Sequence, residues 1–281
     1  MHLDFPAASN TFVSPRVMGI LNVTPDSFSD GGRYLEVDRA IEHALQLVAE
    51  GADIIDVGGE STRPGARPVS FAEEIDRVAP VIAGIAQASS VVISIDTSKP
   101  EVMRAAAAAG AGMINDVRAL SSEGAMAAAA DLGLPVCLMH MQGQPVNMQL
   151  NPAYSDVVDE VRNYLLERAA ACIRGGIPRD RILLDPGFGF GKSLQHNLEL
   201  LRHLDRFVDT GFAVLAGLSR KSMIATLLGD PDRDRLAGSV TLALYAVRKG
   251  VHIVRVHDVA QTVDALKIDA AVAGRDGINS G

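Results

Sequence analysis

The chain is poor in aromatic residues and in cysteine, and these shortages limit the kind of core and of cysteine site that it can form. It has no tryptophan, and aromatic residues make up only 4% of its 281 residues. Its two cysteines, Cys137 and Cys172, are far apart in the sequence. They therefore predict two buried thiols rather than a zinc cluster or a disulfide framework. We expect a core built mainly from Ala, Val, Ile and Leu.

Long apolar runs and an excess of positive charge are also missing. No stretch approaches the roughly 18 uninterrupted apolar residues of a membrane-spanning helix, and residues 1–15 do not resemble a signal peptide. We therefore expect a cytoplasmic protein. Acidic residues outnumber basic ones by 34 to 26, which gives a net charge of −8. This balance argues against sequence-independent binding to nucleic acid.

Eight short apolar runs alternate with longer segments of helical periodicity. The predicted strands cover 17–23, 53–57, 91–96, 113–117, 136–141, 182–185, 213–218 and 253–257. We expect the first helix from Val37, the second from a capping box of Ser70 and Glu73, and the third from a cap at Ser98 followed by Pro100. Apolar strands that alternate with helices indicate a parallel sheet buried on both faces.

Eight such units in one chain favour an α/β fold of the (β/α)8 TIM barrel type, in a single domain. Periodicity alone also allows an open, doubly wound sheet. We assign the barrel to residues 17–274, a short N-terminal lead to 1–16 and a C-terminal tail to 275–281. The lead is expected to form a small lid at the bottom of the barrel.

Polar residues follow the predicted strands at the points where they end. In a βα barrel these ends meet at one face, where active sites lie. Any one of the residues could be a helix cap or a packing contact, and we favour that interpretation for Asp56 and His140. The whole set indicates a site, because caps do not require Lys, Arg and His. Its members are Asn22, Asp56, Asp96, Asn115, His140, Asp185, Ser219, Lys221, Arg255 and His257.

The residue types in this set suit a nitrogen heterocycle and an anion. A carboxylate can accept two parallel hydrogen bonds from an N–H/NH2 edge. Arg255 and His257 alternate around Val256, so they face the same side of their strand, where they suit a phosphate or pyrophosphate group. We expect the cations to gather at this face and the acidic residues to be spread elsewhere, because an anionic ligand must otherwise meet a negative protein.

Two glycine-containing polar segments follow the first two strands. They cover 24–32 (TPDSFSDGG) and 58–65 (GGESTRPG), and they are either connecting turns or mobile lids over a substrate. Neither matches the P-loop pattern, and the chain has no HExxH, zinc spacing or nucleophile elbow. A third segment, 185–192 (DPGFGFGK), places Phe188 and Phe190 near the same face.

Several segments, taken in order, resemble the signature motifs of the dihydropteroate synthase family of pterin-binding enzymes. They are 19–32 (GILNVTPDSFSDGG), 56–65 (DVGGESTRPG), 94–100 (SIDTSKP), 114–117 (INDV), 138–143 (LMHMQG), 184–192 (LDPGFGFGK), 219–222 (SRKS) and 255–258 (RVHD). The resemblance implies a (β/α)8 transferase of folate biosynthesis. It would condense 6-hydroxymethyl-7,8-dihydropterin diphosphate with p-aminobenzoate, release pyrophosphate, be inhibited by sulfonamides and commonly form a homodimer.

The resemblance also implies a role for each motif residue. The pterin would be held by Asp96, Asn115, Asp185 and Lys221. The diphosphate would be held by Asn22, Thr62, Arg255 and His257, with Mg2+ near Asn22. The p-aminobenzoate pocket would comprise Phe28, Ser61, Pro64, Phe190 and Ser222. Asp30 and Arg63 could pair across the two loops and would join Lys221, Arg255 and His257 in the catalytic set.

Two alternatives stay open at this point. A pterin-dependent methyltransferase of the same barrel superfamily would resemble the chain at Asp96, Asn115 and Asp185. It would not be expected to have the lysine of SRKS, the 24–32 segment or the RVHD ending. A paralogue that binds pterin without catalysing a reaction is the second alternative.

Overall fold

The fold is a closed barrel of eight parallel strands. The computed structural model describes residues 15–23, 33–61, 67–143, 148 and 150–274. Each strand pairs with the next in chain order, and β8 returns to pair with β1. The predicted TIM barrel is therefore confirmed, and the open doubly wound sheet is excluded. The strands are β1 (Arg16–Asn22), β2 (Ile54–Gly58), β3 (Val92–Asp96), β4 (Met113–Asp116), β5 (Val136–Met139), β6 (Ile182–Asp185), β7 (Ala213–Ala216) and β8 (Ile253–Val256).

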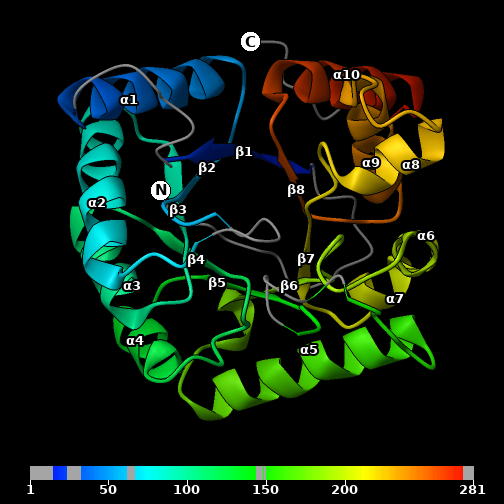
Figure 1. The fold of residues 1–281 in the computed structure, drawn as a ribbon, viewed down its shortest axis with the longest axis horizontal. Helices are drawn as coiled ribbons and strands as arrows, with labels where there is room; N and C mark the ends of the chain where they lie inside the picture. The colour runs from blue at the N-terminus through cyan, green and yellow to red at the C-terminus, as the bar shows by residue number, and fades with distance from the viewer. Residues whose placement is uncertain (1–14, 24–32, 62–66, 144–147, 149, 275–281) are drawn as a thin grey trace.

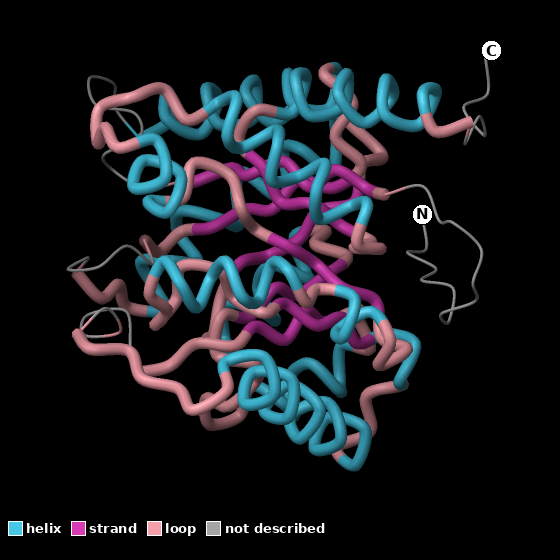
Figure 2. Tube along the Cα trace, turned by 90° about the vertical axis from the view of Figure 1, so that its right-hand side faces the viewer, coloured by secondary structure: helices cyan, strands magenta, loops and turns pink. Residues whose placement is uncertain are grey.

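Helices form a ring around these strands (Figure 1). Seen from the side, the strands run through the middle of the molecule with helices above and below them (Figure 2). Two helices, α8 and α9, follow β7, as the sequence predicts. The α-helices are α1 (Arg33–Ala49), α2 (Phe71–Ala88), α3 (Pro100–Ala109), α4 (Ala125–Leu132), α5 (Val157–Arg174), α6 (Leu194–Arg202), α7 (Asp205–Val208), α8 (Ser222–Leu228), α9 (Leu236–Arg248) and α10 (Val259–Val272), and a short 3-10 helix, η2 (Arg179–Arg181), precedes β6.

Two predicted helix starts need correction. Helix α1 begins at Arg33 rather than Val37, because an apolar stripe marks only the buried face and the first turn precedes it. Ser98 does not cap α3. Lys99 is the N-cap residue, and the Ser98 hydroxyl donates instead to the buried carboxylate of Asp116. A buried charge needs hydrogen bonds more than an exposed helix end does.

Of the other capping predictions, the cap at Ser70 and the place of Pro100 agree with the structure, but the predicted capping box is only half formed. The Ser70 hydroxyl caps α2 by accepting a hydrogen bond from the Glu73 amide at 3.2 Å. The Glu73 side chain accepts from Arg77 at 2.5 Å. Pro100 stands in the first turn of α3, where its missing N–H is not needed.

Both faces of the strands are buried. Their outward side chains pack against the helices in the larger core. Their inward side chains form an apolar layer of Met18, Ile54, Val92, Met113, Cys137, Leu183, Ala213, Leu215 and Ile253. Both cysteines are buried and free, as predicted. Within the described ranges, no helix is long and apolar enough to span a bilayer. The predicted N-terminal lid falls almost entirely outside the described residues.

Candidate active site at the barrel mouth

Strand register places the first predicted site residues side by side at the C-terminal ends of the strands, which we call the mouth. Asn22 of β1 pairs with Gly58 of β2, which pairs with Asp96 of β3, and Asp96 pairs with Asn115 of β4. Because successive side chains on a strand alternate between faces, Asp56 lies on the same face as Gly58, one layer below. Four neighbouring strands thus contribute polar groups to one half of the mouth.

Arg255 of β8 crosses the barrel to meet this half. Its Nε donates to Asp56 Oδ2 at 2.6 Å, and a terminal nitrogen donates to Asp96 Oδ2 at 2.9 Å. Asn115 Nδ2 donates to the same oxygen of Asp56 at 3.0 Å. Asp56 is 0% exposed. It is a buried pairing partner that fixes Arg255 and Asn115, in line with the predicted packing role.

Asp56, Asp96 and Asp185, the three acidic residues that the sequence predicts at the mouth, all lie there beside Arg255 and Lys221. The expectation that acidic residues are spread elsewhere does not hold for these three. A buried cation needs a counter-charge, because solvation is lost on burial. Burial raises the pKa of Asp96 to about 7, against the lowering effect of Arg255 and with further raising by Asp56. The mouth is therefore a mixed ionic network rather than a positive cavity.

The other half of the mouth contains Asp185, Phe190 and Lys221. Asp185 Oδ1 accepts a hydrogen bond from the Gly187 amide at 2.8 Å. Burial raises the pKa of Asp185, while the Gly187 amide and Lys221 act to lower it. Lys221 Nζ stands 4.4 Å from the centre of the Phe190 ring. Burial, assisted by Arg255, lowers the pKa of Lys221 to about 8, so this lysine is mostly protonated at pH 7.

His257 lies just beyond β8 and contacts Ser219 beyond β7. Its Nδ1 is 3.0 Å from the Ser219 hydroxyl oxygen, which also accepts from the His257 amide at 3.2 Å. Burial and the neighbouring Arg220 and Arg255 lower the pKa of His257 to about 4. His257 is therefore a neutral imidazole at pH 7. It can donate a hydrogen bond to an anion but does not add a positive charge.

The remaining predicted residues are only partly covered. Ser61 is partly buried shortly after β2, and Ser222 is exposed at the start of α8, next to Lys221. Phe28, Asp30, Thr62, Arg63 and Pro64 fall outside the described residues. The pairing expected between the two loops therefore stays a prediction.

Two lysines near the mouth had no role in the sequence-based prediction. Lys99 Nζ contacts Glu60 Oε2 at 2.7 Å and also the buried Glu74. Glu60 Oε1 accepts from the Val69 amide at 3.0 Å, so Glu60 joins the two ends of the segment between them. Lys192 is buried behind the loop that carries Phe190. Lys99 lies in the SIDTSKP motif and Lys192 in the LDPGFGFGK motif. Their position inside these motifs is the sequence feature that could have indicated a role.

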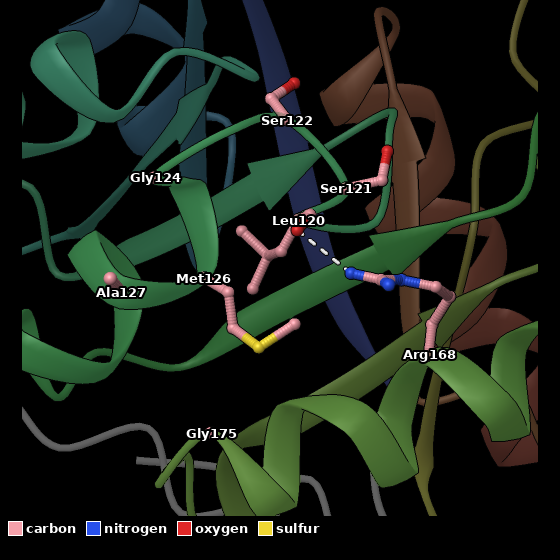
Figure 3. A pocket seen from close by; sticks show the side chains of 8 residues that line it. All are labelled: Leu120, Ser121, Ser122, Gly124, Met126, Ala127, Arg168 and Gly175. Atoms are coloured by element: carbon pink, nitrogen blue, oxygen red, sulfur yellow. Dashed lines mark hydrogen bonds between the residues drawn. The ribbon is translucent and has the colours of Figure 1, made fainter.

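A separate hollow lies on the outer wall between α4 and α5 (Figure 3). Its lining includes Leu120, Met126 and Gly175. Arg168 from α5 donates to the carbonyls of Ala119 and Leu120 at 2.9 Å, so its guanidinium holds the β4–α4 connection. None of the predicted site residues lines this hollow, which is why the mouth remains the candidate site.

Comparison with known proteins identifies the class first. The model of the "Pterin binding enzyme" family matches residues 18–257, so barrel and mouth together define a pterin-binding enzyme. Dihydropteroate synthase of Escherichia coli strain K12 is 56% identical over 254 residues, which cover 90% of this chain and 90% of that protein. The chain belongs to the dihydropteroate synthase family, as its motifs predict.

Solved structures agree over nearly the whole chain. Dihydropteroate synthase of Xanthomonas albilineans with 4-aminobenzoic acid is 55% identical, with a TM-score of 0.87, over 92% of this chain and 93% of that one. The same enzyme with 7,8-dihydropteroate is 52% identical, with a TM-score of 0.84, over 94% and 95%. The Yersinia pestis enzyme with a sulfonamide drug is 50% identical, with a TM-score of 0.89, over 98% and 100%.

Proposed function

We propose that the chain condenses 6-hydroxymethyl-7,8-dihydropterin diphosphate with p-aminobenzoate to form 7,8-dihydropteroate and pyrophosphate. Family membership supports this reaction, and so do the 4-aminobenzoic acid and 7,8-dihydropteroate bound to the Xanthomonas relative. The structural observation that supports this reaction most directly is the set of polar groups at the mouth. Buried carboxylates, an amide and an ammonium group from β3, β4, β6 and the end of β7 meet there.

Asp96, Asn115, Asp185 and Lys221 would hold the pterin. The ring presents N–H and NH2 donors together with a carbonyl acceptor. Carboxylates can accept paired hydrogen bonds from the donors, and Lys221 can donate to an acceptor. Asp185 is buried and Asp96 is largely buried, so their hydrogen bonds to a ligand would be stronger than on the surface. A positive charge that develops on the ring as the leaving group departs would be stabilised by these two carboxylates.

Asn22, Thr62, Arg255 and His257 would hold the diphosphate. The bond between the pterin methylene carbon and the diphosphate oxygen breaks, and its electron pair leaves with pyrophosphate. The amine nitrogen of p-aminobenzoate forms the new bond to that carbon and releases a proton to solvent. Arg255 would stabilise the leaving-group charge, which requires it to share its contacts with Asp56 and Asp96. His257 would contribute a hydrogen bond from a neutral ring.

A magnesium ion would fit beside Asn22. Mg2+ prefers oxygen ligands and keeps several waters, so one protein amide plus substrate phosphates suffices. The Asn22 side chain is exposed at the end of β1. Gly58 keeps the space next to it open, since a Cβ there would lie 3.9 Å from Asn22 Oδ1 and 3.8 Å from Asp96 Oδ2. When bound, the ion would neutralise charge on the diphosphate.

The p-aminobenzoate pocket would comprise Phe28, Ser61, Pro64, Phe190 and Ser222, and the loop pair Asp30 and Arg63 would close it. The Phe190 ring offers an apolar face to the aromatic ring of p-aminobenzoate, next to the pterin-binding Lys221. Sulfonamides would compete there, which the complex of the Yersinia relative supports.

The deciding experiment measures pyrophosphate release from the pterin diphosphate, with and without p-aminobenzoate, and with Mg2+ or EDTA. We expect release coupled to dihydropteroate formation, dependent on Mg2+ and inhibited by a sulfonamide. Binding of pterin without release would contradict the synthase assignment and favour the non-catalytic paralogue. A methyl-transfer assay with and without a corrinoid protein tests the methyltransferase alternative.

We also propose a homodimer formed through helices α8 to α10, which lie together at one side of the barrel (Figure 1). Exposed apolar side chains on these helices support it: Leu227, Leu228, Tyr245, Ile268 and Val272. Sedimentation should give twice the chain mass of 29.6 kDa. Ile268→Glu with Val272→Glu should give monomers, whereas Phe71→Glu on α2 should not. A monomeric wild-type protein would contradict the proposal.

A further inference from the structure

Lys192 has an unusual environment for a buried lysine. Its side chain is 3% exposed. Its Nζ donates to the carbonyl oxygens of Gly187 and Phe190 at 2.9 Å each, and of His140 at 3.3 Å. It also lies 3.0 Å from His140 Nδ1. In the described part of the chain, its hydrogen-bond partners are thus carbonyls and an imidazole. Buried lysines are usually paired with carboxylates, so this arrangement calls for a specific explanation.

The imidazole contact defines the state of His140. While Lys192 is protonated its ammonium group has only donors, so Nδ1 then accepts and the ring proton sits on Nε2. Burial and the charge of Lys192 lower the pKa of His140 to about 3, which keeps the ring neutral. Tyr164 packs edge-on against it, with ring centroids 5.0 Å apart and planes at 89°. His140 is therefore a rigid acceptor at the end of β5.

The loop between β6 and α6, which carries Lys192, can lie against the segment after β5 only because it contains glycine. Gly187 has φ +70°, and a Cβ there would lie 1.9 Å from the His140 carbonyl oxygen. Gly191 has φ +62°, and its Cβ would lie 2.5 Å from the Gln142 carbonyl oxygen. The backbone of the loop therefore lies directly against the chain that follows β5. Lys192 bonds across this contact and ties the two segments together.

The same loop touches two of the proposed pterin-binding groups. The Gly187 amide donates to Asp185, and the Phe190 ring lies under the Lys221 ammonium. Gly189 also faces Lys221, since a Cβ there would lie 3.2 Å from Lys221 Cδ. A shift of the loop would therefore move Phe190 and change the surroundings of both Asp185 and Lys221.

We propose that Lys192 is a positioning residue, which holds the 187–190 loop against His140 and so sets the places of Phe190 and Lys221 at the mouth. This inference rests on the proposed function and extends it to a residue that does not touch the substrate. The lysine suits the task because three carbonyls converge on one point, and an apolar side chain would remove its hydrogen bonds to all three. The Gly187 carbonyl would keep only its bond from the Phe190 amide.

The test compares Lys192→Met with Lys249→Met. Methionine keeps most of the volume and removes the donors, and Lys249 pairs with Asp205 on the exposed surface away from the mouth. We expect folded Lys192→Met to bind 7,8-dihydropteroate about tenfold more weakly and to lose about 100-fold in kcat/KM, as small misplacements in active sites do. Lys249→Met should match wild type. Wild-type affinity and kcat/KM in folded Lys192→Met would overturn the proposal, whatever its effect on Tm.

A second variant and a spectroscopic signal keep the proposal testable if Lys192→Met does not fold. His140→Phe keeps the ring packing and removes only one of the contacts. We expect it to raise KM for the pterin diphosphate about threefold with kcat nearly unchanged, and an unchanged KM would count against the proposal. In wild type below pH 7, where Lys192 is mostly protonated, the 15N shifts of His140 should show an unprotonated Nδ1 and a protonated Nε2. The reverse tautomer would overturn the contact itself.

Failure of the proposed function would be distinguishable from failure of this inference. If wild type released no pyrophosphate, pterin affinity and the His140 signal would still report on the loop contact. A weaker affinity in Lys192→Met would then support the positioning role in a protein that only binds pterin.

Discussion

Two lysines without a predicted role hold opposite sides of the mouth, and they do so in different ways. Lys99, at the start of α3, is 25% exposed and pairs with the carboxylates of Glu60 and Glu74. Lys192, after β6, is buried and meets carbonyls and an imidazole. Burial would lower the pKa of Lys99, but its hydrogen bonds to Glu60 and Glu74 outweigh that effect and raise it. Burial lowers the pKa of Lys192 to about 7.

The difference follows from the hydrogen-bond acceptors that each loop presents to its lysine. The segment after β2 contains a glutamate, so a lysine can join its ends through an ion pair. The segment from 187 to 191 contains only Gly and Phe, so it offers carbonyl oxygens alone. A motif lysine can thus hold a loop by charge or by backbone dipoles, and the sequence of the loop decides which. The two arrangements should respond differently to mutation and to pH.

The largest effect on stability is expected from Gly187→Ala, which changes the loop that Lys192 holds through backbone carbonyls. A positive φ and a Cβ 1.9 Å from the His140 carbonyl oxygen cannot both be accommodated without moving backbone. We expect a loss of about 3 to 5 kcal/mol in the free energy of unfolding, measured by urea denaturation. Gly176→Ala is the matched control, since it has φ +96° with nothing within 4 Å of its Cβ. The control should cost about 1 kcal/mol. Equal losses in both variants would refute the close contact.

Lys99→Met should have the next largest effect, because it leaves the buried Glu74 carboxylate without its partner. We expect a loss of about 2 to 3 kcal/mol, less than for a fully buried pair since Lys99 retains some exposure. Adding Glu74→Leu should recover part of that loss. A double variant as unstable as the sum of both single variants would mean that the two side chains do not interact.

The two lysines should also give different pH dependences of stability. A lysine with a lowered pKa binds fewer protons when folded than when unfolded between about pH 7 and the unfolded value near 10.4. Stability must therefore rise with pH in that window. The deficit of Lys192→Met relative to wild type should grow by up to about 1 kcal/mol per pH unit between pH 7.5 and 9.5.

The contribution of Lys99 has the opposite sign. Its raised pKa means that its stabilisation is fully present below the unfolded value and is lost only as pH rises through the higher folded value. The deficit of Lys99→Met should therefore stay constant between pH 7.5 and 9.5. Urea denaturation of both variants across this range measures the two slopes. A flat Lys192 deficit would show that its ammonium is not destabilised by burial.

The smallest effect is expected from Glu60→Gln. The amide oxygen can still accept from Val69, and only the attraction to a partly exposed lysine is lost. We expect a change of less than about 1 kcal/mol, visible as a small decrease in Tm. A loss as large as that of Lys99→Met would mean that Glu60, rather than Glu74, is the main partner of Lys99.

Much of the barrel and of its mouth could be predicted from the order of residues. Strands made of apolar runs bury both faces, and the residue that ends each run must lie where parallel strands converge. Asn22, Asp96, Asn115 and Asp185 were identified by this logic. The sequence predicts the start of helix α1 four residues late, because the first turn, RYLE, precedes the apolar stripe that begins at Val37.

Contacts between distant segments could not be predicted in this way. Arg255 meets Asp56 across 199 positions and Asp96 across 159, so the barrel had to close before these charges could neutralise one another. The sequence predicts Ser98 as a helix cap, but in the structure its hydroxyl donates to the buried Asp116. The sequence therefore predicted acidic and basic residues at the mouth but not that Asp56 and Asp96 pair with Arg255.

By itself, the sequence determined the family, the eight strand–helix units and the face on which the polar residues gather, because these depend on local periodicity and on motifs read in order. Only the tertiary structure decided which charges are paired, which histidines are neutral and how Lys99 and Lys192 hold their loops. Those properties depend on burial and on distances of a few ångströms between segments far apart in the chain, and desolvation acts only once the barrel has closed.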